Sequence, residues 1–130
     1  MRKKYKGSIT IEMTCILPLF ALVFVFGVWG SFYYHDKSIL SSCAYETAVM
    51  GSTKVREKET ITEGLLKEAF QERIRGKCIL FSSVDAMAQI DEEAVVVKAQ
   101  GQRKNMKTAV VHTAAVTEPE SYIRKMRKLK

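Results

Sequence analysis

The sequence predicts an α+β protein in which one N-terminal transmembrane helix leads into a small exported domain. An apolar run of 22 residues without a charged side chain, Met13–Tyr34, is followed by apolar residues at helical spacing. After residue 77 the pattern changes to short runs rich in β-branched residues. At 130 residues, the chain holds one domain at most beside the membrane segment.

The apolar run has the length and composition of a membrane span. A bilayer core of about 30 Å requires about 20 apolar residues in a helix. A buried helix of a small soluble protein would show a polar face at helical spacing, and this run shows none. Pro18 lies within it, which a membrane helix tolerates. We expect Pro18 to kink the helix because it removes one backbone hydrogen bond.

The charges beside the run predict its orientation. Four basic residues lie before it, and Lys37 is the one basic residue close behind it. Cytoplasmic flanks carry the excess of Lys and Arg, so we expect a single-pass protein of the cell membrane with a cytoplasmic N-terminus and an extracellular C-terminal part. Residues 36–130 carry 17 basic and 13 acidic residues, which is weak evidence for nucleic acid, and we expect no such partner. The basic cluster at residues 124–130 fits an anionic wall or membrane surface better.

Three kinds of N-terminal segment fit these features: a secretory signal, an uncleaved anchor and a prepilin-type leader. The one cleavage site for a secretory signal is Val28-Trp29-Gly30, before Ser31, and the apolar stretch is long for such a signal. An uncleaved anchor explains the basic flank and the apolar run. It does not explain Gly7-Ser8 followed by the carboxylate of Glu12 at the start of the run.

The stretch KGSITIE, followed by Leu-Pro six residues past its glutamate, resembles a prepilin-type (class III) leader. Within that class it is similar to the TadE-like pseudopilins, whose pattern looks like G-[SA]-x-[TV]-[VI]-E before an apolar stretch with Leu-Pro. The ending PESYIR is similar to a Pro-x-x-Phe-Ile-Arg ending of that family, with Tyr122 in place of Phe. The resemblance covers residues 1–50 well. Six positions carry it: Gly7, Ser8, Ile11, Glu12, Leu17 and Pro18.

The resemblance implies a leader at residues 1–7 that a prepilin peptidase removes between Gly7 and Ser8. The cut chain would then consist of a transmembrane helix at residues 8–35 and an extracellular α+β domain at residues 36–130. Glu12 would become its fifth residue. It could pair with the new α-amino group of its own chain or of a neighbour, and the resemblance implies the neighbour's amine and a role in subunit docking. A carboxylate near the end of a membrane helix costs about 1 to 3 kcal/mol and needs a partner. The positive end of the helix dipole is the simpler explanation of this charge.

For function, the resemblance implies a minor or assembly subunit of a Tad-class type IV pilus or a related secretion system. Its partners would be the prepilin peptidase, other pilins or pseudopilins, and the inner-membrane assembly platform. The alternative is an uncleaved single-pass surface protein that binds or senses a wall component.

Two helices are expected around the start of the exported part. The membrane helix is expected to continue to Gly51-Ser52, where glycine favours an end. A second helix should open with a capping box formed by Thr60 and Glu63, and should end at Gly76. Its apolar stripe consists of Ile61, Leu65, Leu66, Ala69, Phe70 and Ile74.

The remainder predicts a small antiparallel sheet and a closing helix. Residues 77–116 contain three or four short strands, with turns at Asp91–Glu93 and Gln100–Met106. A second capping box, formed by Thr117 and Glu120 around a proline, predicts a short C-terminal helix.

The sequence offers little for catalysis. Of its two histidines, His112 has no base or orienting group near it in sequence, and His35 lies beside aromatic residues at the end of the apolar run. There is no CxxC, HExxH or glycine-rich phosphate loop. We therefore expect no enzymatic activity, no cofactor and no metal site. Cys15 reads as an apolar residue of the membrane run. Cys43 and Cys78 both lie in the exported part, where a disulfide and two buried thiols are the alternatives.

Overall fold

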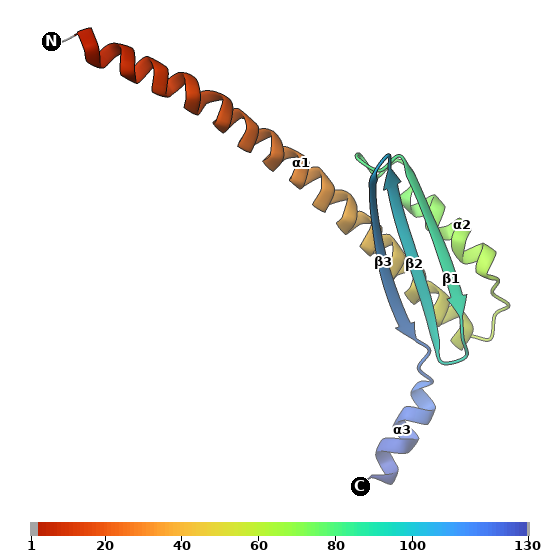
Figure 1. Ribbon diagram of the computed structural model, residues 1–130. Helices are drawn as coiled ribbons and strands as arrows, with labels where there is room; N and C mark the ends of the chain where they lie inside the picture. The colour runs from red at the N-terminus through yellow and green to blue at the C-terminus, as the bar shows by residue number, and fades with distance from the viewer. Residues whose placement is uncertain (1–2, 130) are drawn as a thin grey trace. The chain divides into compact units, whose positions relative to one another are not determined.

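The computed structural model describes residues 3–129, with side chains from Gly7 onward. The chain forms two compact units, one up to Tyr34 and one from His35 on, and each is described by itself. The order of elements confirms the predicted α+β class (Figure 1). These elements are α1 (Lys3–Arg56), α2 (Glu63–Ile74), β1 (Ser83–Ile90), β2 (Ala94–Arg103), β3 (Met106–Ala115) and α3 (Pro119–Lys128).

The first unit consists of the apolar part of α1. Its large side chains are exposed, Leu17 to 74% and Phe24 to 66%, and no residue of its most apolar stretch is buried. Among the described residues, α1 is the one helix that is long and apolar enough to cross a membrane. The helix continues through Pro18 without interruption, and the kink at this residue stays a prediction.

The second unit contains an antiparallel meander in the order β1-β2-β3. Ser83 pairs with Gln102 near one end of the sheet, and Ala94 pairs with Ala115 at the other. The β1–β2 turn contains Asp91–Glu93, as predicted, and the β2–β3 turn lies at the opposite end. Three strands are present in the described part of the chain. Of the first predicted run, residues 77–85, the part up to Ser82 is a loop, because the backbone N–H groups of Ile79, Leu80 and Phe81 bond to a side chain of α1. The rest of this run belongs to β1.

The core lies between one face of the sheet and the two helices α1 and α2, which both lie on that side (Figure 1). Residues of the sheet alternate between this face and solvent, so β2 buries every second side chain. The second half of α1 presents mostly small residues to the sheet, which lets the helix approach closely. The central buried side chains are Leu40, Cys43, Ala44 and Ala48 of α1, Leu66, Phe70 and Ile74 of α2, and Val95, Val97 and Ala99 of β2.

Helix α1 does not end at Gly51-Ser52, and this prediction was wrong. It continues to Arg56 and takes in the first residues of the predicted charged connector. Gly51 is buried, and a Cβ atom at this position would lie 3.0 Å from Val95 Cγ1 and 3.2 Å from Leu66 Cδ1. The glycine therefore serves close packing between α1, α2 and the sheet, and it does not stop the helix.

Neither predicted capping box forms. Helix α2 begins at Glu63 after the N-cap Thr62, and α3 begins at Pro119 after the N-cap Glu118. Both N-cap residues have extended backbone, and neither side chain makes a capping hydrogen bond. The sequence placed the N-cap of α2 two residues too early and that of α3 one residue too early, because Thr60 and Thr117 each precede a glutamate by three residues and so match the motif.

The end of α2 and most of its stripe agree with the prediction. Gly76 follows the C-cap with φ of 74°, a left-handed conformation that glycine adopts without strain. Leu66, Phe70 and Ile74 are buried, whereas Leu65 is 46% exposed on the outer side of the helix.

Candidate functional site

The predicted leader junction lies in the first turns of α1. The Gly7–Ser8 bond is helical, and a Cβ atom at Gly7 would meet nothing within 4 Å. The protein's own packing therefore does not require glycine here. Residues 1–2, and the side chains of residues 3–6 that complete the predicted leader, lie outside the described part of the chain.

Glu12 lies one helical turn after Ser8 on the same side of α1. The Ser8 hydroxyl donates a hydrogen bond to Glu12 Oε1 at 3.4 Å, and both residues are exposed. A neutral hydroxyl at this distance does not balance a carboxylate charge in an apolar environment. Thr14 donates to the backbone oxygen of Thr10 at 2.7 Å, as expected for a hydroxyl in a membrane helix. The structure thus brings together the cleavage and docking residues predicted from the sequence.

A second carboxylate of α1, Asp36, forms a buried and hydrogen-bonded polar site. Its side chain is fully buried, and its two oxygens accept hydrogen bonds from three consecutive backbone N–H groups of the loop before β1. The Ile79 N–H donates to Oδ1 at 3.0 Å, and the Phe81 N–H to Oδ2 at 3.0 Å. The Leu80 N–H also donates to Oδ2, and His35 Nδ1 lies 3.2 Å from Oδ1. Asp36 therefore fixes this loop to the start of the second unit.

The hydrogen bonds set the charge state of Asp36. Burial by itself would raise the pKa of the carboxyl, because a charge is less stable away from water. The backbone donors at Ile79, Phe81 and Leu80, together with His35, stabilise the ionised form and lower its pKa below the ordinary value. The site is therefore an ionised carboxylate held by fixed dipoles, which suits a structural role.

Sequence reasoning treated Asp36 only as a charge beside the membrane run. A signal for its burial was present in the spacing. Asp36, Leu40, Cys43 and Thr47 recur at four, seven and eleven residues, which places the carboxylate on the stripe of α1 that the structure buries. A charge on an apolar stripe requires an internal partner.

The exported cysteines are free thiols in this structure. Cys43 is buried in the core, and Cys78 is half-buried in the loop after α2. Burial raises the pKa of Cys43, and burial with the nearby charges of Asp36 and Cys43 raises that of Cys78 to about 11. Neither thiol is activated as a nucleophile at neutral pH. Their pairing stays a prediction. Cys15 is exposed on the apolar part of α1, as its place in the membrane run predicts.

The histidines make structural contacts. His112 Nε2 lies 2.7 Å from the hydroxyl of Ser41, and its ring meets Tyr45 edge-on at a centroid distance of 5.8 Å. These contacts join β3 to α1. Within the described residues, no group of three or more His, Cys, Asp or Glu side chains is placed to hold a metal ion.

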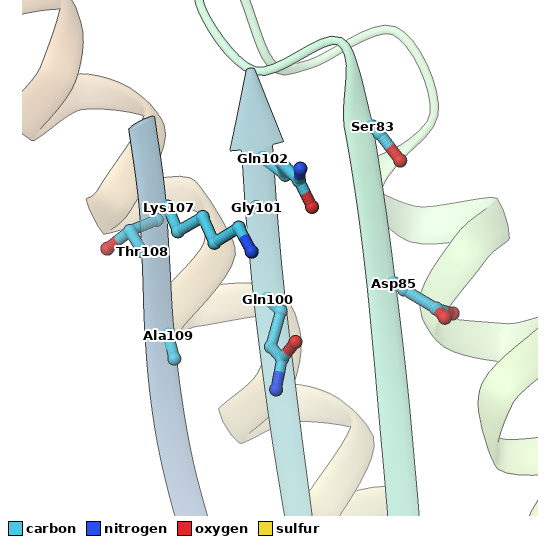
Figure 2. Close-up of a pocket in the computed structure, with 8 residues that line it drawn as sticks. All are labelled: Ser83, Asp85, Gln100, Gly101, Gln102, Lys107, Thr108 and Ala109. Atoms are coloured by element: carbon cyan, nitrogen blue, oxygen red, sulfur yellow. The ribbon is translucent and has the colours of Figure 1, made fainter. Parts of the chain in front are cut away.

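A shallow polar depression lies on the open face of the sheet (Figure 2). Lys107 extends from β3 across β2 towards Gln100 and Gln102. The one carboxylate of its lining, Asp85, forms an ion pair with Lys67 of α2 at 3.0 Å. That contact, as a side-chain hydrogen bond, lowers the pKa of Asp85. The depression has hydrogen-bonding groups but no pair of acid and base for catalysis.

Comparison with known proteins bears on the N-terminal segment. Residues 7–49 match the family model TadE, described as TadE-like protein. Neither a curated protein nor a solved structure matches the chain. The matched range begins at the predicted junction and includes Glu12, Pro18 and Asp36. The match agrees with the resemblance read from the sequence: residues 7–49 of this chain are similar to the TadE-like family.

Proposed function

We propose that the chain is a pseudopilin, which acts as a minor or assembly subunit of a Tad-class type IV pilus or a related secretion system. The observation that carries the proposal is the placement of Gly7 and Ser8 one turn before Glu12 at the start of an unburied apolar helix. All three residues belong to the TadE-like segment. The proposed protein crosses the cell membrane once, with its N-terminus in the cytoplasm and residues 36–130 outside.

Gly7 supports cleavage of the leader. Glycine inside a helix is less favourable than alanine by about 1 kcal/mol, and no neighbour of Gly7 excludes a side chain. The fold therefore gives no reason for glycine here. Close approach of a peptidase to the backbone supplies one, because the absence of Cβ exposes the bond to Ser8.

Glu12 supports docking between subunits. Cleavage would give Ser8 a charged α-amino group one turn before a carboxylate that has a serine hydroxyl as its neighbour. In an array of parallel helices, the amine of one subunit could pair with Glu12 of the next. Such a pair would cancel two charges at the membrane boundary and fix the axial register of the subunits.

The exported unit completes the proposal as a non-catalytic contact module. Its sheet face is open to solvent and the perturbed carboxylates are explained by internal hydrogen bonds and an ion pair. We propose that it meets other pilins or pseudopilins, while the membrane part meets the prepilin peptidase and the inner-membrane platform. It needs no cofactor for this role.

Mass spectrometry of the protein from native membranes tests the proposal. We expect an N-terminus at Ser8. Gly7→Leu should leave the leader attached, because a branched side chain obstructs the peptidase. Gly27→Leu is the matched control, since Gly27 also has open space around it and lies within the apolar run.

Other N-termini would identify the alternatives. An intact N-terminus at Met1 would contradict cleavage and favour the uncleaved anchor that binds or senses a wall component. An N-terminus at Ser31 would indicate a secretory signal instead.

A further inference from the structure

The two turns of the sheet carry opposite charge. The β2–β3 turn, with its flanking residues, contains Arg103, Lys104 and Lys107 and no carboxylate. The β1–β2 turn at the other end contains Asp91–Glu93 and no basic residue. Lys104 has φ of 47°, a left-handed conformation that closes the tight turn and leaves the residue exposed.

The basic turn is tied to the point where the chain enters this unit. Arg103 Nη1 donates a hydrogen bond to the backbone oxygen of Leu80 at 3.2 Å, and the N–H of Leu80 donates to Asp36. Asp36 follows the end of the apolar run at Tyr34 by two residues, or about 3 Å along a helix. The β2–β3 turn is therefore linked through Leu80 to Asp36, which is close in sequence to the end of the apolar run.

The loop before β1 and the first residues of α1 in this unit lie at the same end as the β2–β3 turn, and they add charge and apolar surface to it. Lys37 and Lys77 contribute two further cations, and Ile79 is 61% exposed although its N–H is bonded to Asp36. The one carboxylate in these segments, Asp36, is buried and fully hydrogen-bonded. Exposed cations beside an exposed isoleucine match an anionic lipid surface, which offers phosphates to the cations and an apolar boundary to the isoleucine.

We propose that the β2–β3 turn is a membrane-docking element that binds the anionic headgroups of the bilayer into which α1 inserts. Lys104 and Lys107 make this contact, and Arg103 positions the turn through Leu80. The docked turn holds the exported unit against the membrane surface before the subunit is taken up by a partner. The basic helix α3 does not serve this contact, because it follows β3 at the end of the sheet where Ala115 pairs with Ala94.

Hydrogen–deuterium exchange of the full chain in nanodiscs tests the inference. Amides of residues 102–107 should exchange about fivefold more slowly in phosphatidylglycerol nanodiscs than in phosphatidylcholine nanodiscs. This is the factor in binding that one cation contributes near an anionic surface. High salt should remove the difference by screening. The turn at residues 91–93 should exchange equally in both lipids.

Variants separate the proposed contact from other basic regions. Lys104→Asn combined with Lys107→Gln should abolish the lipid dependence, and asparagine tolerates the left-handed backbone at position 104. Lys125→Gln combined with Lys128→Gln removes the same charge from α3 and should leave the difference unchanged. A lipid dependence that follows α3 and not the turn would overturn the proposal.

The same experiment distinguishes this inference from the proposed function. It needs α1 in a bilayer but neither leader cleavage nor filament assembly. Equal exchange of residues 102–107 in both lipids, in a chain that has entered the nanodisc, overturns the docking element alone. A chain that does not enter nanodiscs overturns the membrane span and the docking element together.

Discussion

Glu12 and Asp36 are the two carboxylates in the first 45 residues, and the chain treats them in opposite ways. Asp36 is buried, and three backbone N–H groups and a histidine surround its oxygens. Glu12 is exposed on an apolar helix, where the contact that the structure gives it is a serine hydroxyl at 3.4 Å. Asp36 is satisfied within its own chain, whereas the described residues give Glu12 only this one contact.

The difference indicates where each charge acts. A carboxylate with its full set of internal donors stabilises the fold, and its removal should be felt by the isolated protein. A carboxylate at a membrane boundary without such donors needs a partner from outside the chain. The contrast therefore supports a role for Asp36 in folding of the exported unit, and it is the basis of the proposed contact of Glu12 with another subunit.

The largest effect on stability is expected at Asp36. Asp36→Ala leaves three loop N–H groups without an acceptor, and Leu80 and Phe81 are buried. Because each unpaired buried donor costs about 1 to 3 kcal/mol, we expect the free energy of unfolding to fall by about 3 to 5 kcal/mol. Denaturant unfolding of the full chain in detergent, followed by a spectroscopic signal of the sheet, measures this change in unfolding free energy.

Asp85→Ala is the matched control for this prediction. Asp85 is exposed and its ion pair with Lys67 lies at the surface, so the variant should lose no more than about 1 kcal/mol. Equal losses of unfolding free energy at the two positions would show that the buried hydrogen bonds of Asp36 stabilise the fold no more than a surface ion pair does.

A smaller effect is expected at Gly51, where α1 packs on the rest of the second unit. A side chain here meets Val95 and Leu66 at 3.0 and 3.2 Å, so Gly51→Leu should destabilise the protein by about 1 to 3 kcal/mol. Gly64→Leu in α2 has open space around it and should be neutral or stabilising. A stabilised Gly51→Leu variant would contradict the assigned packing role.

The smallest change in unfolding free energy is expected on lowering the pH, and it tests the charge of Asp36 directly. The folded pKa of Asp36 is below the ordinary value of 3.8, so the ionised form stabilises the fold fully above that value. This contribution is lost as the pH falls through the lowered folded pKa. The difference in unfolding free energy between the native chain and Asp36→Asn should therefore shrink in acid. A difference that stays constant from neutral pH down to pH of about 2 would mean that ionisation is not involved.

The sequence contained most of the architecture. The uncharged run of residues 13–34 predicted the apolar helix, the β-branched residues 95–97 predicted a strand, and Gly76 predicted the end of α2. These features depend on local periodicity or on backbone conformation, which a short stretch of sequence expresses by itself. The residues of the N-terminal site were also readable, because their spacing is local.

The misses share a physical cause. Gly51 read as a helix end because its role depends on Val95 and Leu66, which lie far away in sequence. Residues 77–82 were read as a strand, although their N–H groups are taken by Asp36, more than 40 residues earlier. Contacts with residues distant in sequence determine the structure at these positions, and local sequence patterns do not reveal such contacts.

The most direct test of the contrast is the amount of the Glu12→Gln variant in sheared filaments, measured beside the amount of cleaved protein in membranes. If Glu12 pairs with the amine of a neighbouring subunit, the amide leaves that amine unpaired at a cost of about 3 to 5 kcal/mol. We expect normal insertion, cleavage and unfolding stability, with incorporation reduced by about two orders of magnitude or more. If Glu12 only favours its own helix dipole, worth about 0.3 to 1 kcal/mol, the variant will enter filaments normally, and the docking role will be contradicted.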